Sequence, residues 1–210
     1  MQIDKGLFVT FEGIDGCGKT TQVTALRQSL EEKGTKVIVI REPGATLIGE
    51  KIRSILLDNA NCGMSSETEV LLYEAARAQI VNEVIRPALR EGKVVICDRF
   101  YDSSLAYQGY ARGLSLESID SLNRFATGGL EPDLTYLLDL PAEAAWARMN
   151  NREGSHDRLE IEGLGFMDKV RAGYLELAGK HARIITLDAM SPATVLAEYI
   201  DRKFWEVFDT

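Results

Sequence analysis

The chain has 210 residues, of which 45% are hydrophobic, so its length and composition predict one compact domain with a substantial buried core. Its formal net charge of −8 argues against a broad surface for nucleic acid or for an acidic membrane, so any anion site must be local. The amino-terminal residues lack a signal-peptide pattern and no apolar run reaches the length of a membrane span, which predicts a cytoplasmic protein.

The cysteines and histidines form no metal-binding pattern. Cys17, Cys62 and Cys97 are an odd, scattered set without a C-x-x-C pair, which indicates reduced thiols and not a disulfide or zinc framework. His156 and His181 stand apart from other soft ligands, and the sequence contains no H-E-x-x-H. We therefore expect both histidines at the surface.

The first predicted element is a buried strand at residues 7–11, LFVTF, where β-branched and aromatic residues form a short apolar run. The next stretch, GIDGCGKT at residues 13–20, fits the phosphate-loop pattern G-x-x-x-x-G-K-[ST]. In this pattern backbone N–H groups surround phosphate oxygens, Lys19 reaches the β- and γ-phosphates, and Thr20 offers its hydroxyl to Mg²⁺. A helix follows, and its amino-terminal dipole favours the same phosphates. The candidate triphosphate-binding positions are Gly13, Ile14, Asp15, Gly16, Cys17, Gly18, Lys19, Thr20 and Thr21.

A second apolar run at residues 36–40 predicts another buried strand, and the order strand, helix, strand predicts a parallel sheet. This strand leads into REPG at residues 41–44. Ligands of parallel sheets bind at the carboxyl ends of the strands, so we expect these charges to face a site. Residues 48–56 have helical spacing, and the pattern leaves open whether Arg53 is solvated or contacts an anion.

A long helix is predicted from residue 66 to about residue 89, beginning with a Ser-x-x-Glu capping pattern at Ser66 and Glu69. Tyr73 and Arg77 lie four residues apart in this helix and therefore share one face. Taken alone, they are typical of an ordinary surface pair. They gain a functional meaning only if their face borders the phosphate site.

The third buried strand is predicted at residues 93–98, and it ends in Asp98 followed directly by Arg99. An acid at the end of a hydrophobic strand can face Mg²⁺ or its waters, and a base at the same edge suits phosphate. The alternative is a salt bridge within the loop. Residues 103–109, SSLAYQG, offer hydroxyls and an amide that can read a base or sugar by hydrogen bonds, although the pattern alone is that of a polar helix start.

The remaining sequence continues the alternation of strands and helices. Residues 151–158, NREGSHDR, are the most polar stretch of the chain and lie between two predicted helices. They suit a short mobile lid at about residues 150–160, in which Arg152 or Arg158 could swing over phosphates; the alternative is a solvated loop. The remaining strands are predicted at residues 134–140 and 183–187, and the remaining helices at residues 116–126, 142–150, 159–178 and 192–208.

These elements predict an α/β protein with a three-layer P-loop NTPase fold. Five parallel strands would form one sheet flanked by helices, with the lid inserted late in the chain. No repeat or linker divides the sequence, so residues 1–210 are predicted to form a single domain.

Six sequence segments carry a resemblance that extends over nearly the whole chain. In order they are FEGIDGCGKTTQ, REPG, YEAAR, DRFYDSSLAYQGYARG, EPDLTYLLDLP and the DRLE that follows the polar stretch. Together they resemble the bacterial thymidylate kinases, which transfer the γ-phosphoryl group of ATP to dTMP and form dTDP. REPG or DRF alone would be weak signals, but the whole set in this order is specific.

The resemblance implies a role for individual residues. Lys19 would hold the ATP phosphates, Thr20 and Asp98 would hold Mg²⁺, and Arg53 and Arg99 would clamp the phosphate of dTMP. Asp15 would bind the 3′-hydroxyl of dTMP. Its carboxylate repels ATP, so another group must offset that repulsion. The implied dTMP-binding residues are Asp15, Glu42, Pro43, Arg53, Tyr73, Arg77, Arg99, Ser104, Tyr107 and Gln108.

The resemblance also implies how the thymine and the deoxyribose are recognised. Tyr73 would stack on thymine, although the family commonly has phenylalanine there, and the added hydroxyl needs a partner. Arg77 would reach the exocyclic oxygen of the base. Ser104 and Gln108 would complete base recognition, and Tyr107 would crowd C2′ and so favour deoxyribose.

The family divides by whether the loop position after the aspartate is basic. Here it is Gly16, which resembles the group whose transition-state arginine comes from the lid. Arg152 and Arg158 are the candidates, and the lid sequence NNREGSHDRLE matches the family only at its DRLE end, so the choice between them stays open. The implied catalytic residues are Lys19, Asp98, Arg99 and a lid arginine, with ATP and dTMP as substrates, Mg²⁺ as cofactor and a homodimer as the assembly.

Three other functions compete with this hypothesis. A related kinase for another nucleotide or deoxynucleoside is the nearest, and Arg77, Ser104, Tyr107 and Gln108 argue against it. A GTP-driven switch should carry an N-K-x-D sequence for guanine, and the chain has none. A purely structural module would have no need of an intact GKTT.

Overall fold

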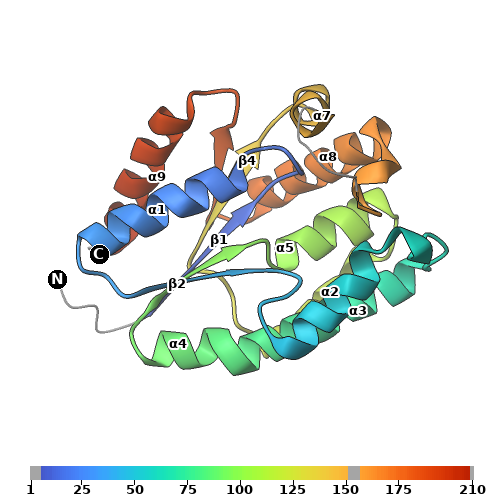
Figure 1. Cartoon of the computed structure of the whole chain (residues 1–210), viewed down its shortest axis with the longest axis horizontal. Coiled ribbons are helices and arrows are strands. Elements are labelled where there is room, and N and C mark those ends of the chain that lie inside the picture. Colours follow the sequence, from blue (N-terminus) through green and yellow to red (C-terminus); the bar gives the residue numbers. More distant parts are fainter. Residues whose placement is uncertain (1–5, 151–156, 209–210) are drawn as a thin grey trace.

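The computed structural model describes residues 6–150 and 157–208. Within these residues, five parallel strands form one sheet in the order β2-β3-β1-β4-β5, and helices cover both of its faces (Figure 1). The predicted α/β fold, with a five-stranded parallel sheet between helices, is confirmed. The strands are β1 Leu7–Glu12, β2 Val37–Arg41, β3 Val94–Asp98, β4 Leu134–Asp139 and β5 Ile184–Asp188.

Two hydrophobic clusters fill the space between the sheet and the helices. On one face, side chains such as Val9 and Ile96 pack against Leu26 of α1 and Ile200 of α9, which lie side by side in Figure 1. On the other face, Phe8 and Val95 pack with residues of α3, α4 and the turn between them. Alternate residues of β1 and β3 thus supply opposite faces, as strand periodicity requires.

Nine α-helices are present in the described part of the chain. They are α1 Lys19–Glu32, α2 Leu47–Leu57, α3 Ser66–Ile80, α4 Arg86–Arg90, α5 Tyr101–Ser104, α6 Leu116–Thr127, α7 Ala142–Asn150, α8 Leu164–Lys180 and α9 Ala193–Phe208. Two π-helical stretches, Val81–Ile85 and Leu105–Ala111, continue α3 and α5, and short 3₁₀ helices lie at Asn59–Asn61 and Glu160–Glu162.

Two local predictions need correction. The cap of α3 is Ser65, whose hydroxyl accepts a hydrogen bond from the N–H of Thr68, and not Ser66. The helix predicted at 159–178 begins only at Leu164, since Gly163 has a φ of 85° that an α-helix cannot contain. The pattern of a polar helix start at residues 103–109 agrees with the structure, in which α5 runs directly into a π-helix and residues 101–111 are helical throughout.

The carboxyl ends of three neighbouring strands, β2, β3 and β1, meet at one edge of the sheet. Phe11 of β1 and Arg41 of β2 are both in register with Asp98, the last residue of β3. The phosphate loop follows β1 at this edge, so the predicted charged residues converge there. Of the predicted lid, residues 151–156 lie outside the described residues, and Asp157 begins the turn before the Glu160–Glu162 helix. In the described ranges, no helix combines the length and hydropathy that a membrane crossing needs.

Candidate active site

The phosphate loop joins β1 to α1 in a conformation that depends on glycine. Gly16 and Gly18 have positive φ angles of 79° and 98°, which residues with a side chain rarely adopt. Lys19 begins α1 and is almost fully buried, and its ammonium donates to the carbonyls of Gly13 (3.0 Å) and Ile14 (3.1 Å). No described side chain caps α1, so its first N–H groups are available to an anion.

Two adjoining pockets open at this edge of the sheet. The loop pocket, about 1400 Å³, lies over the phosphate loop and is lined by Lys19 and Thr20. The α3 pocket, about 500 Å³, lies between the loop and α3 and is lined by Tyr73. The two pockets share five lining residues: Asp15, Glu42, Arg53, Arg99 and Asp157. A ligand in one pocket would therefore lie next to a ligand in the other.

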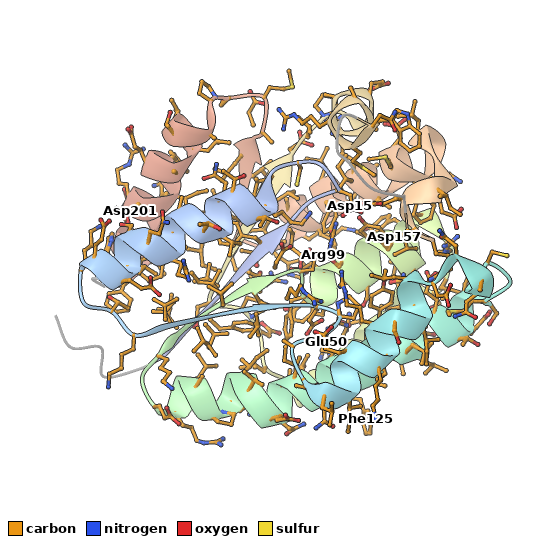
Figure 2. The ribbon with its side chains drawn as sticks, viewed as in Figure 1. Asp15, Glu50, Arg99, Phe125, Asp157 and Asp201 are labelled. Atoms are coloured by element: carbon orange, nitrogen blue, oxygen red, sulfur yellow. The ribbon has the colours of Figure 1, made fainter. Side chains whose placement is uncertain are left out.

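Arg99 and Asp15 form the centre of this shared wall, and Figure 2 shows them close together near Asp157. The guanidinium donates to the Asp15 carboxylate (2.7 Å), to the Gly13 carbonyl (2.9 Å) and to the Tyr174 hydroxyl (3.0 Å). Burial raises the pKa of Asp15, but the charges of Arg99 and Lys19 outweigh it and hold that pKa well below its usual range. Asp15 is therefore ionised at neutral pH.

Glu12, the last residue of β1, lies beneath Arg99 and was not predicted as a site residue. Its carboxylate accepts hydrogen bonds from the Phe100 N–H (2.7 Å), the Ser103 hydroxyl (2.7 Å) and the Tyr174 hydroxyl (2.9 Å). Burial first, and then the charge of a nearby aspartate, raise the pKa of Glu12 to about 7. The sequence signal was available, since Glu12 ends an apolar strand as Asp98 does.

The face of α3 that Tyr73 and Arg77 share does border the site, but the two residues lie at different depths. Tyr73 lines the α3 pocket. Arg77 is 1% exposed, and its guanidinium donates to Glu42 (2.8 Å), to Glu74 and to the Ser104 hydroxyl (2.9 Å). In the described structure Arg77 therefore stands behind the pocket wall and contacts two residues of that wall, Glu42 and Ser104.

The predicted residues can be sorted by where the structure places them. Of the implied dTMP contacts, all but Arg77 line the α3 pocket: Asp15, Glu42, Pro43, Arg53, Tyr73, Arg99, Ser104, Tyr107 and Gln108. The predicted residues that line the loop pocket are Asp15, Gly16, Gly18, Lys19, Thr20, Glu42, Arg53, Asp98 and Arg99.

Of the two candidate lid arginines, the structure describes only Arg158. Arg152 lies outside the described residues. Arg158 is 4% exposed and does not line either pocket; its guanidinium lies 2.5 Å from the Glu69 carboxylate and donates to the Leu56 carbonyl (2.7 Å). In the described structure Arg158 is thus an anchor against α2 and α3.

Some lining residues had no prediction. Arg148 of α7 lines the loop pocket and donates to the Ala189 carbonyl (3.1 Å), and Asp157 lines both pockets. Arg148 lies in the last turn of the helix before the polar stretch, and this position is the signal that sequence analysis could have used. Asp157 precedes a predicted arginine, but nothing in its spacing distinguishes it from a solvated acid.

Comparison with known proteins gives a consistent result. The family model described as thymidylate kinase matches residues 11–200. A thymidylate kinase of Desulforudis audaxviator is 57% identical over 174 residues, 82% of this chain and 78% of the relative. Thymidylate kinases of Desulfosudis oleivorans and Kosmotoga olearia are 51% and 49% identical over 198 and 199 residues, and each alignment covers more than nine tenths of both chains. The chain therefore belongs to the thymidylate kinase family.

Proposed function

We propose that the chain transfers the γ-phosphoryl group of ATP to dTMP and releases ADP and dTDP. The observation that carries the proposal is the pair of pockets with a common wall at Arg99 and Asp15. One pocket has the phosphate loop that a triphosphate needs, and the other has an aromatic ring and hydrogen-bonding groups that suit a nucleoside. The common wall is where a phosphoryl group would pass between them.

Lys19, Arg53 and Arg99 supply the charges that this transfer requires. Phosphoryl transfer needs mainly alignment of donor and acceptor and stabilisation of charge on the transferred group. Lys19 and the amino terminus of α1 would hold the ATP phosphates. Arg53 and Arg99 line both pockets, so they can clamp the dTMP phosphate beside the γ-phosphoryl group.

The α3 pocket supports recognition of thymine and deoxyribose. Tyr73 would stack on the base, and Ser104 and Gln108 would bond its edge. That Arg77 reaches the exocyclic oxygen stays a prediction; its hydrogen bond to Ser104 supports at least an action through that hydroxyl. Tyr107 donates to Asp15 (3.2 Å) and both line the α3 pocket, which supports placing the sugar against these two side chains.

The loop pocket also suits a magnesium ion. Thr20 and Asp98 both line it, and a hydroxyl and a carboxylate are oxygen ligands of the kind that Mg²⁺ prefers when phosphates complete its coordination. When bound, Mg²⁺ would neutralise charge on the β- and γ-phosphates. We propose Thr20 and Asp98 as the residues that hold it, directly or through water.

The charge on the γ-phosphoryl group would be met by an arginine of the predicted lid. The ion pair between Arg158 and Glu69 favours Arg152 for this role, because a buried and paired guanidinium is costly to move. We place the reaction in the cytoplasm, where the free thiols of Cys17, Cys62 and Cys97 stay reduced.

We further propose a homodimer formed through α2, α3 and α6, which pack side by side. Leu47 of α2 is 76% exposed, Leu71 of α3 is 55% exposed and Phe125 of α6 is 88% exposed. Figure 2 shows Phe125 at the outer edge of the molecule. Phe125→Asp should convert a two-chain mass in sedimentation velocity to a one-chain mass. An unchanged mass would contradict the proposal.

One assay tests the proposed reaction. ADP release is measured with ATP and each of dTMP, dUMP, UMP, CMP and AMP, and dTMP should give the highest kcat/KM. Lys19→Met, which keeps the buried stem but removes the charge, is the control for contaminating kinases and should lose at least about a hundredfold in turnover. A preference for another monophosphate would instead support a related kinase of different base specificity.

A further inference from the structure

Glu69 is a buried carboxylate that the proposed reaction does not use. It lies near the start of α3, one turn before Tyr73, and is 1% exposed. Gln108 donates to it (2.8 Å), Arg112 donates to both of its oxygens (3.1 and 3.2 Å), and Arg158 pairs with it at 2.5 Å. Burial raises the pKa of Glu69, but the hydrogen bonds from Arg112 and Gln108 outweigh it, so the pKa is lowered and the carboxylate is charged.

The charge of Glu69 decides which way the Gln108 amide faces. An ionised carboxylate can only accept hydrogen bonds, so Gln108 must turn its amide nitrogen toward Glu69. The amide oxygen is then the group that Gln108 can offer to a ligand in the α3 pocket, which it lines. An oxygen there accepts from the N3–H of thymine and meets only a lone pair at N3 of cytosine.

Glu69 also holds part of the pocket wall through Arg158. Arg158 lies between Asp157 and Leu159, both of which line the α3 pocket. Besides pairing with Glu69, Arg158 donates from its side chain to the Leu56 carbonyl (2.7 Å) at the end of α2. The described 157–162 segment is therefore fastened to the wall of the pocket by one buried ion pair and its neighbouring hydrogen bond.

We propose that Glu69 is a positioning residue for base selection, whose carboxylate orients the Gln108 amide for thymine and, through Arg158, fixes the 157–162 segment as a wall of the α3 pocket. This inference rests on the proposed function, because it concerns how the same pocket selects its base. It assigns Glu69 no contact with the substrate.

The first test replaces the carboxylate by an amide. In Glu69→Gln, Arg158 and the Nη2 of Arg112 both face the Oε2 position and can only donate, so they favour the new amide oxygen there. The new nitrogen then takes the Oε1 position, where it faces Gln108 and leaves the Nε–H of Arg112 without its acceptor. Gln108 then turns its oxygen inward and its nitrogen to the pocket, which suits N3 of cytosine. The kcat/KM ratio of dTMP over dCMP should fall at least tenfold, about 1.4 kcal/mol. A ratio within twofold of the unaltered enzyme overturns the orienting role.

The second test separates the role of Glu69 in fixing the 157–162 segment from its role in orienting the Gln108 amide. Arg158→Met keeps the side-chain length and removes the ion pair, so the dTMP Kd measured by calorimetry should rise about tenfold while the ATP KM and the base preference stay unchanged. Arg158→Lys should restore part of the affinity. An unchanged dTMP Kd, or an equal rise for both substrates, overturns the wall-fixing role.

Two controls keep the outcomes distinct. Arg202→Met removes an exposed ion pair with Glu206 (3.9 Å) on α9 and should change none of these values. Gln108→Met applies even if Glu69→Gln does not fold. It should lower the kcat/KM ratio of dTMP over dCMP at least tenfold, with Ser104 left to read the base, and a ratio within twofold of the unaltered enzyme overturns the inference. If the unaltered protein phosphorylates neither pyrimidine nucleotide, the proposed function itself fails.

Discussion

The Arg99 guanidinium lies 2.7 Å from the Asp15 carboxylate, so the residue after β3 is joined to the phosphate loop by an ion pair. Arg99 makes this contact from a left-handed backbone conformation, with φ at 69°. Such a conformation is unfavourable for arginine and persists only where surrounding contacts hold it. In the proposed reaction this contact would offset the repulsion between Asp15 and a triphosphate, and it would place the guanidinium proposed to clamp the dTMP phosphate beside the phosphate loop.

Asp15→Asn should separate the two roles of this carboxylate. The amide is a weaker acceptor for the 3′-hydroxyl of dTMP and no longer holds Arg99 by charge, so we expect kcat/KM for dTMP to fall about tenfold or more. For 3′-deoxy-dTMP, which lacks the hydroxyl, the fall should be much smaller. Asp120→Asn at the surface is the control. Equal losses for both nucleotides would show that Asp15 does not read the 3′-hydroxyl.

Tyr107 should act as a steric gate for the sugar. Tyr107→Ala opens space beside C2′, so the UMP-to-dUMP ratio of kcat/KM should rise. Tyr107→Phe is the matched control: it keeps the ring, loses the hydrogen bond to Asp15 and should leave the ratio unchanged. Because Tyr107 is buried in the core, Tyr107→Ala should also lower the free energy of unfolding by roughly 3 kcal/mol or more. A constant ratio in a folded variant contradicts the gate.

Glu12 should make stability depend on pH. Its pKa is raised by burial from an ordinary 4.5 to about 7, so the folded protein binds a proton that the unfolded chain has released between these pH values. The stabilisation is complete below pH 4.5 and is lost as the pH rises through 7. In the unaltered protein, Glu12 should make the free energy of unfolding fall by up to about 1.4 kcal/mol per pH unit in this range. In Glu12→Gln this contribution to the slope should be absent, as urea titrations from pH 5 to 8 would measure.

The control for this measurement is Glu198→Gln, which alters an exposed carboxylate on α9 and should leave the slope unchanged. If Glu12→Gln has the slope of the unaltered protein, Glu12 titrates at its ordinary pKa and the buried hydrogen bonds do not depend on its proton.

A lid arginine should affect turnover far more than binding. Arg152→Ala is expected to lower kcat by about a hundredfold with both KM values little changed, because the contact would exist mainly in the transition state. Arg158→Met should raise the dTMP KM instead, as its ion pair with Glu69 requires. If neither change lowers kcat by about tenfold, the charge is met by Arg99, Lys19 and the metal.

The sheet and the phosphate loop could be predicted because their signals are local. Each strand is a short apolar run ended by a polar residue, so all five were placed within one or two residues of their observed bounds. The loop pattern fixes the edge of the sheet at which ligands bind. From that edge the positions of Arg53, Arg99 and Gln108 around one site followed from the family resemblance.

What could not be predicted depends on contacts between distant parts of the chain. Nothing near Arg158 indicates that it is buried against Glu69, and the spacing of Tyr73 and Arg77 does not reveal that one lines the pocket and the other lies behind it. The pattern of a helix start at residues 103–109 does not reveal that Leu105–Ala111 is a π-helix, which packs against the distant helix α8.

Gly16 limits how this enzyme could evolve or be re-engineered. A Cβ at this position would lie 2.7 Å from the Ala145 carbonyl oxygen of α7, and the positive φ adds backbone strain. A single mutation to arginine therefore cannot simply move the catalytic charge from the lid into the loop, since the neighbouring helix must shift first. A substitution at Ala145 or Met149 in α7 would have to precede or accompany the change at Gly16. Conversion between an enzyme with a lid arginine and one with a basic loop residue would therefore show epistasis.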